Sequence, residues 1–268
     1  MTLYAIENGA PVELADVFYF DGEYRQLKEI WEWTGTEYVL LHEGRPTPPT
    51  FVGASSGQVT GAGLTINYPA VSSAGDLLVC MATFLNNTAT AFTVASPAGW
   101  NILANTTYTG NTASKTVVMW RFRGVETSVT LTASTSANIM TGAGDIIAYK
   151  GGTTNPSAPV AVWAAGPESP VANPTGIPVV TTPVPNCALA MFVQTMTASV
   201  NPYGSAWSGT ATERTDDSIA FSTFARYQHS SATDVALVSG PTPAYQVTGS
   251  APTGLSYHEY AGIVAVQP

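Results

Sequence analysis

The sequence predicts an all-β protein: a small N-terminal hairpin module followed by a large β-sandwich. Only 10% of the 268 residues are charged, against roughly 25% in an average soluble domain. Apolar runs of strand length alternate with Gly, Asn, Pro and Ser turns, and no helical periodicity persists beyond about one turn. The 27 aromatic residues (9 Phe, 6 Trp and 12 Tyr) suffice for a hydrophobic core.

The charge balance excludes one large class of functions. A net charge of −9 argues against a nucleic-acid-binding protein, because phosphate contacts need clustered Lys and Arg. The N-terminus carries no basic and apolar leader, and no apolar run reaches 18 residues. We therefore expect no nucleic-acid partner, no signal peptide and no membrane helix.

Residues 1–45 are predicted to form a separate module, because they hold 12 of the 27 charged residues. The charge density falls at a proline-rich segment, residues 45–50, which should run extended and semi-rigid. We therefore place a Pro/Gly/Ser linker over residues 46–59 and the sandwich over residues 60–268.

Two hairpin-like units follow one another in the small module. Asp21-Gly22 lies between alternating aromatic residues, which is a strong hairpin signal, and Gly35 lies in a similar setting 13 residues later. About 45 residues without a disulfide or metal make a marginal independent fold, so we expect this module to dock onto a partner. The side chains assigned to docking are Phe18, Phe20, Trp31, Trp33 and Tyr38.

The large domain repeats one β-rich unit, over about residues 60–151 and 186–268. Each unit opens on an apolar run, and Met81 of the first run can be superposed on Met191 of the second. Tryptophan-containing turns and further strands follow both runs. We predict a jelly-roll-like sandwich in which two similar halves pack face to face.

Several strand-length runs are apolar on both faces, whereas an antiparallel strand with one wet face should alternate. These runs are residues 77–82, 188–193 and 261–266. A second layer or a second subunit must cover the other face, because one sandwich core covers one face of each sheet. We predict a homo-oligomer, with a trimer favoured.

Cys80 and Cys187 both lie inside apolar runs. Two reduced, buried thiols that behave as small hydrophobic residues are the favoured interpretation. A disulfide that joins the two halves is the alternative.

Signals for catalysis or metal binding are weak. Residues 53–57 match the G-x-S-x-G pattern, which needs a strand before it and a helix after it, so we interpret them as a flexible loop. The three histidines, His42, His229 and His258, lack metal-ligand spacing.

Glu213, Asp216 and Asp217 form the one acid cluster of the large domain. A glycosidase needs two carboxylates that face each other across a sugar, so a solvated turn is the favoured interpretation. Catalysis and an oxygen-ligand cation site near Asp216 are the weaker alternatives. We assign no catalytic residue, no metal and no cofactor, and we do not predict an enzyme.

Tyr203 and Trp207 lie in a Gly/Ser/Pro-rich segment, where burial is not guaranteed. Exposed aromatic rings suit sugar rings, and loops on a rigid sandwich often carry recognition. The two residues are therefore a candidate glycan platform. The favoured interpretation, however, is that Trp207 caps the core, a role that we also expect of Trp100 in the first half.

Several motifs resemble those of a kind of bacteriophage virion protein with a jelly-roll-like unit. The motifs are Gly-Asp-Leu-Leu, Pro-x-Gly-Trp, an arginine-bearing strand and Ala-Tyr-x-Gly, here at residues 75–78, 97–100, 120–123 and 148–151. The hairpin module is similar to short aromatic–Gly units near the start of actinophage-type minor tail proteins. The second half departs from the pattern, because Trp207 and residues 209–214 stand in place of Pro-x-Gly-Trp.

The resemblance implies a virion structural protein that is assembled in the host cytoplasm. The implied role is a minor tail or tail-tip component that adheres to host surface glycans and contacts other virion proteins through its N-terminal module. The alternative is a capsid decoration protein with an architectural role. A polysaccharide depolymerase is less favoured.

Overall fold

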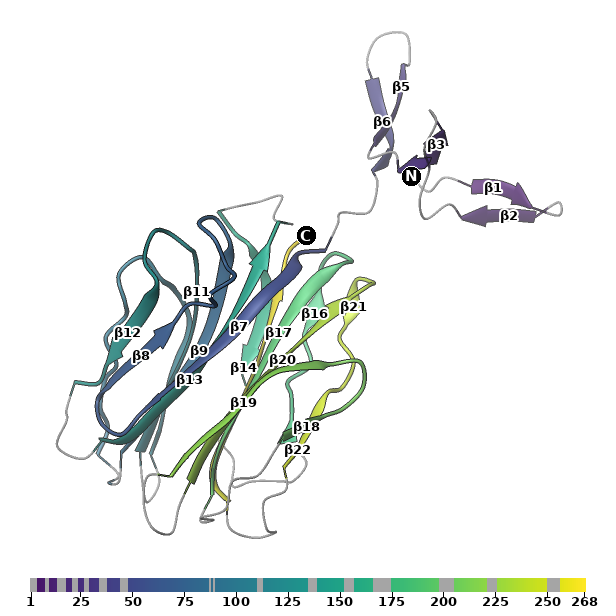
Figure 1. Cartoon of the computed structure of the whole chain (residues 1–268). Helices are drawn as coiled ribbons and strands as arrows, with labels where there is room; N and C mark the ends of the chain where they lie inside the picture. Colours follow the sequence, from purple (N-terminus) through teal and green to yellow (C-terminus); the bar gives the residue numbers. More distant parts are fainter. Residues whose placement is uncertain are drawn as a thin grey trace. The chain divides into compact units, whose positions relative to one another are not determined.

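A computed structural model describes the backbone of six short strands between residues 4 and 43. It also describes residues 48–86, 88, 90–109, 113–134, 139–151, 157–165, 175–197, 205–220, 226–249 and 256–268. Side chains are not described for residues 4–43, 108–109, 139–140, 175, 196–197, 205, 220, 226–227, 249 and 256–259. All regular elements in these ranges are β-strands, which confirms the predicted all-β class (Figure 1). Within the described part of the chain no helix could span a membrane.

The chain divides into two units, Met1–Thr47 and Pro48–Pro268. The first unit holds three antiparallel pairs: β1 (Tyr4–Glu7) with β2 (Ala10–Glu13), β3 (Phe18–Phe20) with β4 (Tyr24–Gln26), and β5 (Glu29–Trp33) with β6 (Tyr38–Glu43). The second and third pairs are the two predicted strand pairs. Four of the assigned docking residues lie in β3 and β5, and Tyr38 of β6 pairs with Trp33. Their docking role stays a prediction.

The first half of the large unit is a five-stranded antiparallel sheet with a strand pair packed on one face. The large sheet has the order β10 (Asn101–Thr109), β11 (Ala113–Phe122), β9 (Leu77–Asn86), β13 (Ile139–Lys150) and β7 (Thr50–Val59). The pair consists of β12 (Ser128–Thr132) and β8 (Gly63–Asn67).

The second half is built on a similar plan. Its large sheet has the order β19 (Thr212–Ala220), β20 (Arg226–Ala236), β17 (Cys187–Thr197), β23 (Ser256–Val266) and β14 (Val160–Ala165). A small sheet of β15 (Thr175–Gly176), β22 (Gln246–Gly249) and β18 (Ser205–Trp207) covers its outer face, next to the pair β16 (Thr181–Thr182) and β21 (Gly240–Pro241). When the five long strands of each half are numbered along the chain, both large sheets have the order 3-4-2-5-1. The jelly-roll topology stays a prediction.

The sheets of the large unit stack in four layers (Figure 1). Three large apolar cores of the described residues lie between these layers. The first outer core, between the first large sheet and β8/β12, includes Leu64, Ile66, Cys80, Phe84, Leu131 and Ile146. The middle core, between the two large sheets, includes Leu77, Val79, Met81, Ile147, Ala190, Phe192 and Val264. The second outer core includes Cys187, Leu189, Met191, Tyr245, Val247 and Ile263.

The superposition of Met81 on Met191 is wrong in register. Met81 faces the middle core, whereas Met191 faces the second outer core. Because side chains alternate between the two faces of a strand, an error of one residue turns every side chain to the wrong face. β9 and β17 do occupy the same position in their sheets.

The strands that are apolar on both faces lie in the two large sheets, so each takes part in two cores of the same chain. This removes the reason for expecting a second subunit as cover, and a trimer remains an untested expectation. Cys80 and Cys187 are free thiols, and they lie in the first and second outer cores respectively.

The predicted linker over residues 46–59 is wrong for residues 50–59, which form the edge strand β7 paired with β13. The glycines that suggested a flexible loop are needed for close packing. A Cβ on Gly53 would lie 2.8 Å from Val71 Cγ2, and a Cβ on Gly57 would lie 2.7 Å from the Thr65 carbonyl oxygen. The G-x-S-x-G match therefore lies inside a strand and not on a turn between a strand and a helix.

Candidate functional site

Trp207 ends strand β18 and packs against the second outer core. Its indole N–H donates a hydrogen bond of 2.9 Å to Ser230 Oγ of β20, and the residue is half-buried. Trp207 therefore caps the core and also keeps part of its surface in solvent. Tyr203, the other residue of the predicted glycan platform, lies outside the described residues.

The chain just after Trp207 is fixed to β22 by two hydrogen bonds. The Ser208 amide donates to the Gln246 carbonyl (2.9 Å), and the Gln246 amide donates to Ser208 Oγ (2.8 Å). Gly209 follows with φ of +70°, a conformation in which glycine carries little steric cost. These contacts hold the position of Trp207 more firmly than a flexible loop would.

The acid cluster predicted on a solvated turn is instead part of edge strand β19. Glu213 lies opposite Ala232 of the neighbouring strand β20, and Asp216 lies opposite Ser230 of the same strand. Ser230 and Ala232 are two residues apart and therefore share one face of the sheet. Both carboxylates therefore lie on the outer face of the second large sheet, on the side of Trp207. An edge strand tolerates this sequence because its side chains reach water, and both acids are exposed.

Asp216 is held in place by Gln228, whose Nε2 donates a hydrogen bond of 2.7 Å to Oδ1. Gln228 itself is buried, so the amide provides a fixed support for an exposed carboxylate. Although Glu213 is exposed, partial desolvation by the neighbouring protein and, after it, the charge of Asp216 raise the pKa of its carboxyl group. Trp207, Asp216 and Glu213 together form a surface that we call the outer-face site.

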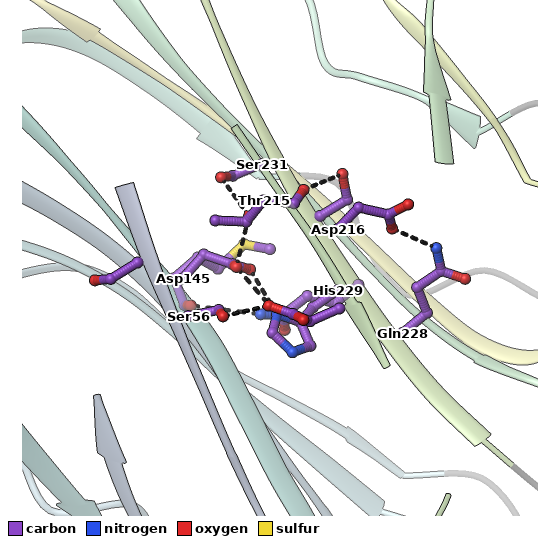
Figure 2. A network of polar contacts seen from close by, with 12 residues as sticks. Ser56, Asp145, Thr215, Asp216, Gln228, His229 and Ser231 are labelled. Carbon is purple, nitrogen blue, oxygen red and sulfur yellow. Dashed lines mark hydrogen bonds and ion pairs between the residues drawn. The ribbon is translucent and has the colours of Figure 1, made fainter. Parts of the chain in front are cut away.

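A second polar cluster lies on the opposite face of the same strands, between the two large sheets. Figure 2 shows Asp145 of β13 next to His229 of β20 at its centre, with Asp216 and Gln228 to the right. His229 Nδ1 lies 3.0 Å from both oxygens of Asp145, and both side chains are 0% exposed. The contact joins the first half to the second.

Two further polar contacts link the halves beside this pair. Thr215 Oγ1 donates to Asp145 Oδ1 (2.8 Å) and lies 2.7 Å from Ser231 Oγ, which must be the donor because Thr215 has one hydroxyl proton. Ser56 Oγ of β7 donates to Asp217 Oδ2 of β19. Asp217 thus lies on the inner face, away from Asp216 and Glu213.

His229 has a raised pKa as the net result of opposed effects. Burial lowers the pKa, but the charge of Asp145, the hydrogen bond to it, and then the charges of Asp217 and Asp216 outweigh burial. The pair therefore favours imidazolium next to carboxylate. A Thr–Asp–His arrangement resembles part of a catalytic triad, but complete burial keeps any substrate from these atoms.

No known protein family, curated protein or solved structure matches this chain. Within the described residues, no group of three or more His, Cys, Asp and Glu side chains could hold a metal ion. His42 and His258 have no described side chains.

The motifs that carry the virion resemblance hold one end of the first half together. Gly75, with φ of +92°, leads to buried Asp76, whose carboxylate accepts from the Ser73 amide (2.6 Å). The Arg123 amide donates to the Asp76 carbonyl (2.8 Å). Arg121 lies over the Trp100 ring, 6.0 Å from its centroid. These contacts stabilise the fold of the first half.

The sequence did not indicate the Asp145–His229 pair, although a signal was present. Asp145 is an isolated acid in the apolar strand β13, and few residues of this chain are charged. An isolated charge in such a strand needs a buried partner. The partner lies 84 residues away, and only the stacking of the two sheets brings it close.

Proposed function

We propose that the protein is a bacteriophage virion structural protein, a minor tail or tail-tip component that adheres to host surface glycans. The motif resemblance supports the virion context. The division into a small unit and a large β-unit suits a protein that is attached at one end and displays the other. The outer-face site is the proposed point of glycan contact.

The observation that carries the glycan proposal is a half-buried tryptophan beside a fixed, exposed carboxylate on a rigid sheet. The apolar face of a sugar ring packs on an indole, and sugar hydroxyls donate hydrogen bonds to carboxylates. Because Trp207 and Asp216 are both fixed by hydrogen bonds, little ordering entropy is lost when a sugar binds.

The charge of the site narrows the ligand class. Glu213 and Asp216 are both acidic, and the whole chain has a net charge of −9. Uronic acids, sialic acids and sulfated sugars would be repelled. The favoured ligands are neutral sugars or amino sugars of the host surface.

Titration of the full-length protein with purified host-surface polysaccharide tests the glycan role. Asp216→Asn should weaken binding at least fivefold without a change in melting temperature, because this carboxylate is exposed. Glu126→Gln, which changes an exposed acid of the first half that pairs with Arg121, is the matched control and should bind normally. Equal binding by all three proteins would contradict the assignment of the site.

The virion role needs a separate test. Negative-stain images of phage particles labelled with an antibody to residues 60–268 should show label at the tail. Label on the capsid would favour a decoration protein, and unlabelled particles would contradict both virion roles. Loss of polysaccharide viscosity on incubation with the protein would instead indicate a depolymerase.

A further inference from the structure

We propose that Asp145 and His229 form a pH-sensitive lock that holds the two stacked halves together while His229 is protonated and weakens as rising pH removes that proton. The lock is independent of the proposed glycan role. It follows from where these two residues lie and from what surrounds them.

The Asp145–His229 pair connects one large sheet to the other. Asp145 belongs to β13 and His229 to β20, and these strands lie against each other across the middle layer. Thr215 adds a second hydrogen bond to Asp145 from β19. The polar pair lies on the side of the interface where β13 contacts β20 and β7 contacts β19. Elsewhere the contact between the two large sheets is largely apolar.

The loss of one proton from His229 changes the charge balance of the buried pair. With His229 protonated, each buried charge has an opposite charge within hydrogen-bond distance. When the imidazole loses its proton, the Asp145 carboxylate stays in a water-excluded site without a countercharge. Thr215 and the neutral imidazole can still donate hydrogen bonds to this carboxylate, but a buried charge without a countercharge is less stable than a buried ion pair. Deprotonation therefore weakens the contact between the halves.

The groups around the imidazole act in the same direction. From β13 it faces Asp145, and from β19 it is influenced by Asp217 and, more weakly, Asp216. Its neighbour on β17, Gln194, is uncharged. All three charged groups are acids, so each favours the imidazolium form.

The direction of the pH effect follows from linkage. The folded pKa of His229 lies above its ordinary value of 6.5. The stabilisation is therefore fully present below pH 6.5 and is lost as pH rises through the folded pKa. Between these two values the unfolding equilibrium constant should rise up to tenfold per pH unit.

The first experiment measures the titration of His229 in the full-length protein. NMR of histidine-labelled protein reports the three imidazoles, and His42→Gln and His258→Gln variants assign the other two signals. The proposal expects His229 to titrate above 6.5. A value at or below 6.5 would overturn it, and this measurement needs no variant at the lock.

The second experiment measures urea unfolding between pH 6 and pH 9. The pH slope should be present in the native sequence and reduced in both Asp145→Asn and the double variant Asp145→Asn/His229→Gln. Hydrogen exchange should accelerate with pH beyond its intrinsic rate in β13 and β20, and much less in β8 and β12. A slope that is unchanged in the double variant, or exchange that accelerates equally in all strands, would show that the pair does not control the contact.

Discussion

The hydroxyl of Tyr149 donates a hydrogen bond of 2.8 Å to the backbone carbonyl of Leu189. Tyr149 is in β13 of the first half and Leu189 in β17 of the second, so a side chain of one sheet is bonded to the backbone of the other. The ring itself lies in the middle core. This contact and the Asp145–His229 pair fix how the two sheets are stacked.

Replacing Tyr149 with Phe should keep the packing and remove this hydrogen bond. We expect a loss of about 1 kcal/mol in the free energy of unfolding. Urea denaturation of the full-length protein measures this loss, and the dependence on denaturant should not change. Burial raises the pKa of Tyr149, so the effect should be the same at pH 6 and pH 9. A variant as stable as the native protein would mean that the bond contributes nothing to the stacking.

The large unit should fold without the first unit, provided that β7 is retained. A fragment of residues 48–268 should show the same thermal transition as the full chain, because the division between the units lies at Pro48. A fragment of residues 60–268 lacks β7 and exposes the edge of β13, so it should melt at least ten degrees lower or aggregate. Calorimetry of both fragments decides the point, and similar melting of the two would contradict the structural role of β7.

Gly57 should not tolerate a side chain. A Cβ there would lie 2.7 Å from the Thr65 carbonyl oxygen and 3.0 Å from Ile66 Cγ1, so Gly57→Ala should cost about 1–3 kcal/mol. Gly63 is the matched control in the adjoining strand β8, because a Cβ on it would meet nothing within 4 Å. Gly63→Ala should be neutral or slightly stabilising. Equal effects of the two substitutions in urea unfolding would contradict the close approach of β7 and β8.

Both cysteines should be unreactive in the folded protein. Burial, and after it the charge of Asp145, raises the pKa of the Cys80 thiol, and burial also raises that of Cys187. Because thiolates are the reactive form, a thiol reagent should titrate no thiol at pH 8 in the folded state. In denaturant without reductant it should titrate two thiols per chain. A count of zero in denaturant would indicate a disulfide, contrary to the structure.

The part of the fold that the sequence predicts best is the part with regular patterns. Aromatic alternation around Asp21-Gly22 and around Gly35 indicated two strand pairs, and the structure confirms their pairing. The apolar runs of β9, β17 and β23 were correctly assigned to strands covered on both faces. The sequence favours a second subunit as the cover of these strands, whereas layers of the same chain cover them in the structure, because composition does not distinguish the two.

The missed elements are those where local composition and tertiary context disagree. Glycines and serines in β7 suggest a loop, but close packing on β8 requires small residues. Acids in β19 suggest a turn, but at a sheet edge their side chains reach water. At the candidate site, the residue type alone identifies Trp207 as a candidate. The position of the Asp216 carboxylate near Trp207 follows from the register between β19 and β20, which no local sequence pattern reveals.

The middle core has a consequence for synthesis of the chain on the ribosome. The first large sheet turns Leu77, Val79 and Ile147 towards a layer that belongs entirely to the second half. More than a hundred residues remain to be translated when β13 is complete. At a translation rate of about 5–20 residues per second, this apolar face stays uncovered for roughly 6–24 s, until the second half has been synthesised. During that interval we expect the exposed apolar face to favour binding by chaperones and association with another copy of the first half.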